Sequence, residues 1–326
     1  MKVLWLHNNG DRSSGTFMWD IYDRLRDLSP ALSVSHRTLP LMRGRGAFRE
    51  AVRIARVEPG WDIVHVQYGA LVGALGSSSK GGAYIVSLRG SDSYWRFGSA
   101  RNRAAGLVRV LLSWIACLRS DAVVVMSRSM ARRVRRWPGL GKRAVLCIPD
   151  PAGEIFWPPP AANLAADLLA ESFNVIIASL QHGNPIKRTG IVLEAAELCR
   201  EAGMLLDLRV LSGLSRNEVR ATLDSADCVA LASTHEGWPN IVKEGLLLGK
   251  PFVATDVGDL LEYAGTGSLN QIVGASPIEF ACAWVDQIAS RLLGRHDIPP
   301  ELAPFHPDAV ALKHRLLYLA YRMTKA

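Results

Sequence analysis

Short apolar runs alternate along the whole chain with longer stretches whose apolar residues recur at helical spacing. The runs are rich in Val, Ile and Leu, which is typical of strands buried on both faces of a parallel sheet. In the first half they predict strands near residues 2–6, 33–38, 63–67, 84–88, 122–126 and 144–148. In the second half they predict strands near residues 174–179, 207–212, 228–232, 252–255 and 269–273. Strands alternating with helices in this way indicate doubly wound α/β structure.

A proline-rich segment divides this alternating pattern into two halves. Pro149 and Pro151 are followed by three consecutive prolines at 158–160, which break any continuing strand and stiffen the connection. A chain of 326 residues also exceeds what one hydrophobic core usually serves. We therefore expect one Rossmann-like domain over residues 1–155 and a second over residues 156–304. Apolar residues at helical spacing predict a last helix over about 305–326.

Charge is divided unevenly between the two halves. Residues 1–150 hold 24 Lys and Arg against 10 Asp and Glu, whereas residues 151–326 hold 14 against 20. A basic first half indicates an anionic partner that meets this half alone. The densest basic cluster consists of Arg132, Arg133, Arg135 and Arg136. The chain shows no basic strand interleaved with aromatic residues, so we expect no nucleic-acid partner.

A helix predicted around residues 107–118 carries apolar residues bracketed by arginines. Helices of this kind dock on anionic lipid surfaces, so a membrane is one candidate partner for the basic half. The alternative is that the apolar face of this helix belongs to the core of the first domain. The segment contains Arg109 and is too short to span a bilayer.

The cysteines and the start of the chain indicate a reducing compartment. Five cysteines are scattered, odd in number and never in a Cys-x-x-Cys pair, which argues against a disulfide framework and a zinc site. Met1 and Lys2 lead directly into a short apolar strand, which is not the pattern of a signal peptide. We therefore expect a cytoplasmic protein.

Two glutamates, Glu236 and Glu244, stand on either side of a predicted helix start. Pro239 suits the first helical position, because its fixed φ and missing N–H cost nothing there. The amides of Asn240 and Ile241 would then point out of the helix start, where the helix dipole favours a phosphate. A phosphate with a carboxylate on either side to accept hydroxyl protons describes a sugar-nucleotide site. The spacing alone would equally fit a solvated helix start with two exposed acids.

Residues 233–262 resemble the nucleotide-sugar-binding segment of retaining glycosyltransferases of family 4, a branch of the GT-B fold. The sequence of this segment is similar to that of the subgroup that builds bacterial surface polysaccharides, such as the teichuronic-acid-type transferases. Segments 62–69, 87–92, 120–127 and 184–188 resemble further family segments in the same order. The resemblance implies two Rossmann-like domains facing across a cleft, with the last helix packing back on the first domain.

The resemblance also implies roles for particular residues. The catalytic group would be Glu236 at the transferred sugar, Lys187 at the leaving diphosphate, Arg89 and Asp92. The donor-binding group would consist of Glu244 at the ribose, together with Gly15, Lys187, Arg188, Gly237, Pro239, Asn240 and Ile241. Their charge, and not the resemblance, makes Arg132, Arg133, Arg135 and Arg136 the candidate membrane or acceptor surface.

Two positions depart from the family pattern. Arg89 stands where the family usually has His; it can donate hydrogen bonds to a hydroxyl or phosphate but cannot act as a base near neutral pH. The family commonly has an Arg several residues before the Lys, whereas residues 173–186 contain no Lys or Arg. Arg188 is the candidate substitute. Asp92 either orients an acceptor hydroxyl or pairs with a neighbouring arginine.

The resemblance implies retaining transfer of a hexosyl unit from a nucleotide-diphospho sugar to a lipid-linked or glycan acceptor, in surface polysaccharide biosynthesis. UDP and GDP are the expected donor nucleotides. No metal or other cofactor is expected, because no Asp-x-Asp pair lies beside a strand and Lys187 serves the diphosphate. The expected location is peripheral, on the inner face of the cytoplasmic membrane. Two alternatives stay open: an inactive GT-B subunit that binds sugar nucleotide or glycan, and another GT-B enzyme such as a sugar-nucleotide 2-epimerase.

Overall fold

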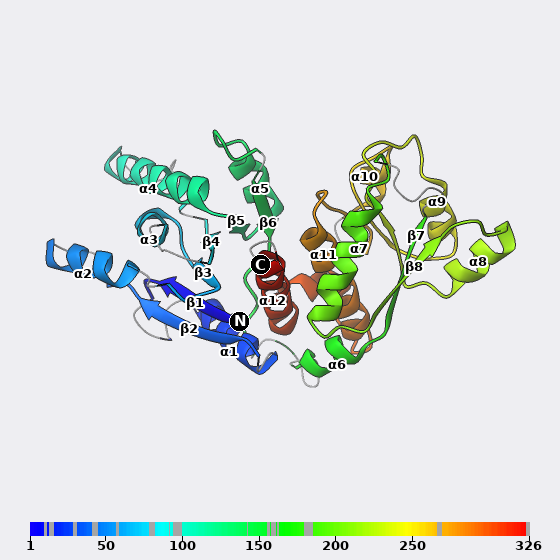
Figure 1. The fold of residues 1–326 in the computed structure, drawn as a ribbon, viewed down its shortest axis with the longest axis horizontal. Coiled ribbons are helices and arrows are strands. Elements are labelled where there is room, and N and C mark those ends of the chain that lie inside the picture. The colour runs from blue at the N-terminus through cyan, green and yellow to red at the C-terminus, as the bar shows by residue number, and fades with distance from the viewer. Residues whose placement is uncertain are drawn as a thin grey trace. The chain divides into compact units, whose positions relative to one another are not determined.

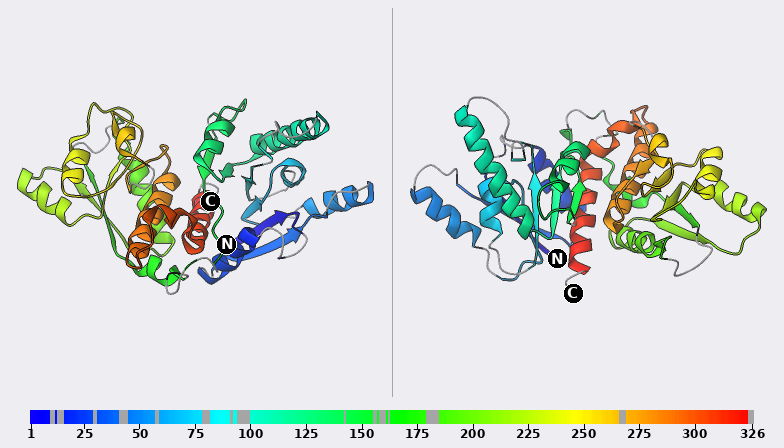
Figure 2. Two further views of the ribbon diagram at one scale, coloured as in Figure 1. Left: turned by 180° about the vertical axis from the view of Figure 1, so that it is seen from behind. Right: turned by 90° about the horizontal axis from the view of Figure 1, so that it is seen from above.

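The computed structural model divides into two α/β units, one of Met1–Glu154 with Tyr321–Ala326 and one of Ile155–Ala320. Figure 1 labels most of their helices and strands, and the colour passes from blue at the N-terminus through green to red at the C-terminus, as it does in Figure 2. The structure describes all residues except 10–11, 13–15, 29–30, 41–44, 57–58, 78–81, 91, 94–99, 142, 155–156, 158–160, 162, 179–184, 266–268 and 324–326.

The first unit is built on a six-stranded sheet in the order β2-β1-β3-β4-β5-β6, with every neighbouring pair parallel. Its strands are β1 (Lys2–His7), β2 (Ser33–Thr38), β3 (Ile63–Val66), β4 (Ala83–Leu88), β5 (Ala122–Val125) and β6 (Ala144–Cys147). The helices between them are α1 (Thr16–Leu28), α2 (Arg45–Ala55), α3 (Ala70–Gly76), α4 (Ala100–Arg119) and α5 (Arg128–Arg135).

The second unit is built on a five-stranded parallel sheet in the order β11-β10-β9-β7-β8. Its strands are β7 (Phe173–Ala178), β8 (Leu206–Leu211), β9 (Cys228–Leu231), β10 (Phe252–Ala254) and β11 (Gln271–Ile272). Its helices are α6 (Ala165–Ala170), α7 (Thr189–Glu201), α8 (Arg216–Asp224), α9 (Asn240–Leu247), α10 (Leu260–Tyr263), α11 (Pro277–Gly294), the 3-10 helix η2 (Pro300–Phe305) and α12 (Pro307–Met323).

The predicted strands agree with these positions to within about two residues. Parallel strands that are covered by helices on both faces need apolar side chains on both faces, so they can be recognised as continuous apolar runs. Every residue of β3, β4, β5 and β9 is buried. The prediction of two Rossmann-like parallel-sheet domains is therefore confirmed.

The boundary between the units follows Glu154, close to the proline-rich segment. Most of α12 groups with the second unit, and only the residues from Tyr321 on group with the first. The ammonium of Lys313, which is 1% exposed, donates to the carboxylate of Asp286 on α11 at 2.7 Å. Packing of the whole last helix on the first domain, as the resemblance implied, stays a prediction.

Candidate functional site

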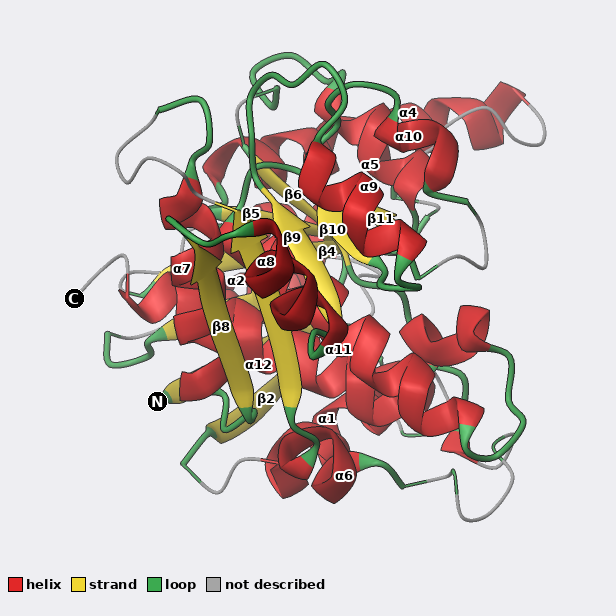
Figure 3. Ribbon diagram, turned by 90° about the vertical axis from the view of Figure 1, so that its right-hand side faces the viewer, coloured by secondary structure: helices red, strands yellow, loops and turns green. Residues whose placement is uncertain are grey.

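The candidate site of the second unit is formed by segments that follow three neighbouring strands. Lys187 and Arg188 lie between β7 and α7, Glu236 follows β9, and Gly258 follows β10. Strands β10, β9 and β7 are adjacent and parallel, so these segments leave the same edge of the sheet (Figure 3). Ligands of Rossmann-like domains bind outside this carboxyl edge.

An ion pair joins Lys187 and Glu236 across this edge. The ammonium of Lys187 donates to Oε1 of Glu236 at 2.5 Å, although 49 positions separate the two residues. The hydroxyl of Ser233 donates to the same oxygen at 2.8 Å. Burial raises the pKa of the Glu236 carboxyl, but the hydrogen bonds from Lys187 and Ser233 outweigh it and the net pKa is lowered. Glu236 is therefore ionised at neutral pH and can accept hydrogen bonds from hydroxyl groups.

The helix start predicted for the phosphate is present, shifted by one residue. Pro239 is the N-cap, in extended conformation, and α9 begins at Asn240 rather than at the proline. The carbonyl of Pro239 accepts from the amides of Val242 and Lys243, each at 3.2 Å. The amides of Asn240 and Ile241 precede these bonds, and Pro239 has no polar side chain that could cap them. The arrangement suits an anion at the helix start.

Gly237 lies in the loop before α9, where its carbonyl is closely approached by Gly258. Gly258, which has a φ of +54°, approaches so closely that a Cβ atom there would collide with the carbonyl oxygen of Gly237. Trp238 in the same loop stacks edge-on against Tyr263 of α10, with ring centroids 5.2 Å apart. These contacts set the path of the chain between Glu236 and the helix start.

Glu244, one turn inside α9, lines a pocket of about 350 Å³ between α8 and α9. This volume lies at the small end of the range for ligand pockets. The remaining lining residues are Leu214, Arg216, Val219, Arg220, Leu223, Leu247 and Leu248. A carboxylate beside an apolar wall suits a nucleoside, whose ribose hydroxyls donate hydrogen bonds and whose base is flat and partly apolar.

The α8 side of this pocket was not predicted from the sequence, although a local sequence signal marks it. Ser215 caps α8 and forms a capping box with Glu218. Leu214 and Val219 flank that box at the two positions of a hydrophobic staple. This pattern fixes a helix start after β8 and therefore places Leu214 and Val219 at the sheet edge.

Arg188 does not join Lys187 at the ion pair. Its Nε donates to the carbonyl of Ala232 at 2.7 Å and its Nη2 to the carbonyl of Ser233 at 3.0 Å. The carbonyl of Ser233 also accepts from the hydroxyl of Thr255 at 2.6 Å. The structure thus shows the Arg188 guanidinium hydrogen-bonded to backbone carbonyls just past the end of β9. A role for Arg188 at the diphosphate stays a prediction.

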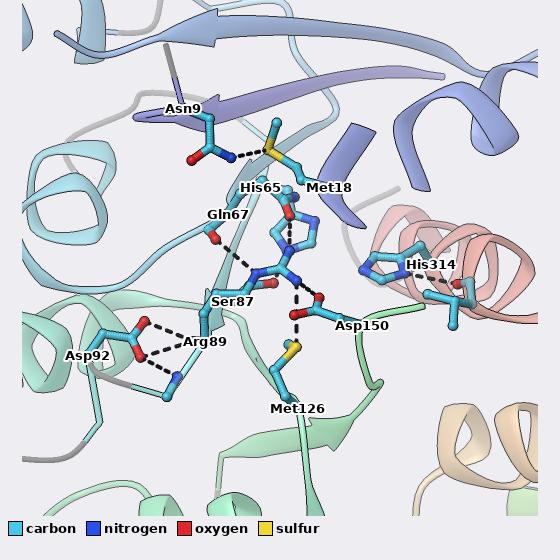
Figure 4. A network of polar contacts seen from close by, with 12 residues as sticks. Asn9, Met18, His65, Gln67, Ser87, Arg89, Asp92, Met126, Asp150 and His314 are labelled. Carbon is cyan, nitrogen blue, oxygen red and sulfur yellow. Dashed lines mark hydrogen bonds and ion pairs between the residues drawn. The ribbon is translucent and has the colours of Figure 1, made fainter. Parts of the chain in front are cut away.

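Arg89 in the first unit is enclosed by protein groups (Figure 4). Its side chain is 7% exposed, forms an ion pair with Asp150, and donates to the Gln67 side chain at 2.7 Å and the Gln67 carbonyl at 3.1 Å. The guanidinium also lies over the ring of Phe17, 4.6 Å from the centroid. This geometry favours a structural role, in which Arg89 ties the end of β4 to the segment that leaves the unit, and a catalytic role for Arg89 stays a prediction.

Asp92 is fully buried and bonded to backbone. Its carboxylate accepts from the amides of Gly69 at 3.0 Å, Arg89 at 2.9 Å and Gly90 at 2.8 Å. Burial raises the pKa of Asp92, and these amides oppose that rise. The structure therefore shows Asp92 fixing the loops after β3 and β4, and contact with an acceptor hydroxyl stays a prediction. Gly15, the remaining candidate, lies outside the described residues.

The basic cluster lies on α5 and its C-cap, Arg136, and the α5 residues Met130, Ala131 and Val134 are buried. Arg132, Arg135 and Arg136 are exposed and Arg133 is half-buried. Arg135 additionally donates to the carbonyl of Val145 at 2.8 Å.

The apolar residues of α4 are partly buried and partly exposed, and membrane docking of the exposed part stays a prediction. Ala116 and Cys117 are buried in the core of the first unit. Leu107, Val108 and Leu111 are 49, 57 and 50% exposed and form an outer apolar stripe. Among the described residues, no helix is both long enough and apolar enough to cross a membrane.

Two protein-family models match the chain, one in each unit. The family described as Glycosyltransferase Family 4 matches residues 20–150, and the family described as Glycosyl transferases group 1 matches residues 165–290. Each model covers less than half of the chain, and together they cover most of both units. The matches support a glycosyltransferase of the GT-B type, with two Rossmann-like domains. The teichuronic-acid-type subgroup and the retaining mechanism stay predictions.

Similar solved structures include Anabaena HepE in complex with UDP-glucose, which is 15% identical with a TM-score of 0.35, over 100% of both chains. Sucrose-phosphate synthase from Thermosynechococcus elongatus is 14% identical with a TM-score of 0.37, over 100% of this chain and 97% of that chain. The lipopolysaccharide outer core galactosyltransferase WaaB is 12% identical with a TM-score of 0.35, over 100% and 99%. Likeness at this level adds no argument about function. No curated protein matches the chain.

Proposed function

We propose that the protein is a retaining glycosyltransferase that moves a hexosyl unit from a nucleotide-diphospho sugar to a lipid-linked or glycan acceptor in surface polysaccharide biosynthesis. The observation that carries the proposal is the Lys187–Glu236 ion pair at the carboxyl edge of the second sheet, in the loops that adjoin the start of α9. A cation, an acid and a helix start gathered at one sheet edge supply binding groups for a diphosphate and for sugar hydroxyls.

Each group has a defined task in this reaction. The amides of Asn240 and Ile241 hold the diphosphate, and Glu244 accepts from the ribose hydroxyls while the base lies in the pocket beside α8. Lys187 has three N–H donors, so it can bond Glu236 and a phosphate oxygen at the same time. Glu236 accepts from hydroxyls of the transferred sugar.

The transfer itself breaks the bond between the anomeric carbon and the diphosphate oxygen and forms a bond to the acceptor oxygen on the same face. The acceptor's proton passes to the departing diphosphate oxygen, so no protein base is required. Negative charge grows on the diphosphate as the bond breaks, and a fixed ammonium stabilises that charge. We propose that this cation serves in place of a metal, with UDP or GDP as the donor nucleotide.

A nucleotide screen followed by a turnover assay tests this function. We expect UDP, GDP and their sugars to raise the melting temperature more than ADP or CDP, because a ligand that binds only the folded state stabilises it by mass action. With the matching sugar nucleotide, free nucleoside diphosphate should accumulate only when an acceptor is added.

The same assay separates the alternatives. An inactive binding subunit would show the thermal shift without nucleotide release. A sugar-nucleotide 2-epimerase would change the sugar without an acceptor present. Either result would contradict the proposed transfer reaction.

We further propose that the first unit rests on an anionic membrane on the cytoplasmic side, from which a lipid-linked acceptor is supplied. The supporting observation is the exposed stripe Leu107, Val108 and Leu111 on α4, in a unit that also carries the basic cluster of α5. Trp114 of α4 donates its indole N–H to the carbonyl of Pro138 at 2.8 Å, which joins α4 to the segment after α5. Apolar residues beside cations are what an interfacial helix requires.

Replacing the four arginines of the basic cluster with Gln should weaken binding to vesicles that contain anionic lipid. Each cation near such a surface contributes about 1 kcal/mol, so the loss should be on the order of a hundred- to a thousandfold. Co-sedimentation measures it, with high salt reducing wild-type binding through screening.

A double variant, Arg53→Gln with Arg56→Gln, removes charge from the end of α2 and the residue after it, and serves as a control for the location of the effect. This variant should bind anionic vesicles more tightly than the double variant Arg132→Gln with Arg136→Gln does. Equal sedimentation with neutral and anionic vesicles would contradict membrane docking and would favour an acidic glycan as the partner of this surface.

A further inference from the structure

Arg188 adopts a backbone conformation that is unfavourable for its residue type. Its φ and ψ are 45° and 40°, in the left-handed region, immediately before α7. A side chain in this region crowds the backbone, whereas glycine adopts it freely. Non-glycine residues persist there when the surrounding structure determines them, and such positions cluster at functional sites. Arg188 directly follows Lys187, the cation of the candidate donor site.

The side chain of Arg188 forms hydrogen bonds that a glycine at this position could not form. Its planar guanidinium bonds two successive carbonyls, those of Ala232 at 2.7 Å and Ser233 at 3.0 Å. Arginine suits such a pair of acceptors because its donors form a rigid fork. These carbonyls lie just past the end of β9, which pairs with β7 in the sheet.

A backbone bond ties the other neighbour of Lys187 to the same segment. The amide of Thr234 donates to the carbonyl of Ile186 at 2.8 Å. Lys187 is therefore held from both sides against residues 232–234, the segment that leads to Glu236. Ser233 within that segment donates its hydroxyl to the Glu236 oxygen that Lys187 also bonds.

We propose that Arg188 is a positioning residue, which holds the Lys187 ammonium against Glu236 through its left-handed turn and its two bonds to the β9 segment. The consequence for turnover rests on the proposed function. The positioning itself does not, because it concerns the geometry of the protein without substrate.

A pH titration of Glu236 tests the positioning directly, by NMR on protein with labelled glutamate carboxyls. The Lys187 hydrogen bond lowers the pKa of Glu236, so a displaced Lys187 should let that pKa rise. Arg188→Gly keeps the turn and removes the guanidinium, while Arg188→Lys keeps the charge and removes the fork. We expect the pKa of Glu236 to rise in both variants.

Arg200→Ala is the matched control, since Arg200 lies on α7, the helix that Arg188 precedes, and also donates to a backbone carbonyl, that of Leu206 at 3.2 Å. It should leave the titration of Glu236 unchanged. An unchanged pKa in folded Arg188→Gly would overturn the proposal. A rise in Arg188→Gly without a rise in Arg188→Lys would also overturn it, because the charge alone would then explain the effect.

Kinetics provide a second readout for the transfer reaction. Arg188→Gly should lower kcat by about tenfold to a hundredfold, the cost of misplacing a catalytic group by about an ångström, with a smaller change in KM. Lys187→Ala should then cost much less in the Arg188→Gly background than in wild type. Additive effects would contradict the positioning role. Absence of turnover in wild type would reject the proposed function while the titration still decides the positioning.

Discussion

Lys187→Ala should lower kcat at saturating donor by about a hundredfold or more. Removing one preorganised group that stabilises developing charge costs roughly 10²–10³ in kcat. The ammonium of Lys187 is held at 2.5 Å from Glu236, so it is fixed before substrate binds. Its attraction for the diphosphate grows as the glycosidic bond breaks, and for this reason the loss should appear in kcat as well as in donor affinity. Steady-state release of nucleoside diphosphate measures both quantities.

Lys187→Arg is the matched variant, because it keeps the positive charge and changes its shape. It should retain more activity than Lys187→Ala, and both variants should show a cooperative unfolding transition. Without the ammonium the pKa of Glu236 should rise, which confirms independently that the pair is broken. Unchanged turnover of Lys187→Ala at saturating donor would show that Lys187 is not the cation of the reaction.

The fold could be predicted from the sequence because its buried strands appear there as continuous apolar runs. In β5, Ala122–Val125, every side chain is buried, and an apolar run of this kind has few alternatives between two helical segments. The first and last residues of the helices were harder to predict from the sequence. Pro239 was predicted at the first helical position but is the N-cap, a shift of one residue that local propensity does not resolve.

Only part of the candidate site could be predicted from the sequence. Glu236 and Lys187 are far apart in the chain, and the family resemblance assigned both to the donor sugar nucleotide without predicting the ion pair between them. The partners of Arg89 were not predictable, because its ion pair with Asp150 joins residues from separate segments. Residue type gave the chemistry available to Arg89, and only tertiary structure showed where that chemistry is used.

Arg188 illustrates the same limit in the second unit. The sequence suggested a cation beside Lys187, whereas the structure shows a left-handed backbone and a guanidinium bonded to two carbonyls. Neither feature follows from the residue type, because arginine rarely adopts this conformation. The departure from local preference is itself the indication of function.

Glu244→Gln should weaken binding of the donor nucleotide by about ten- to a hundredfold while the fold stays intact. Glu244 lines the pocket between α8 and α9, beside the apolar wall that includes Leu214 and Val219. As a carboxylate it can accept from both ribose hydroxyls, whereas an amide has one acceptor oxygen and no charge. Losing a charge-assisted hydrogen bond costs about 1.5–3 kcal/mol, which corresponds to this range of affinity.

Isothermal calorimetry with the nucleotide selected in the thermal screen measures the effect of Glu244→Gln. Glu194→Gln is the matched control, since Glu194 is exposed on α7 and does not line the pocket. The control should bind with wild-type affinity, because removing a negative charge far from the ribose changes only screened, long-range electrostatics. A nucleotide without ribose hydroxyls should bind both Glu244→Gln and wild type weakly, which assigns the loss to the ribose contact. Equal nucleotide affinity in folded Glu244→Gln and in wild type would remove Glu244 from the donor site.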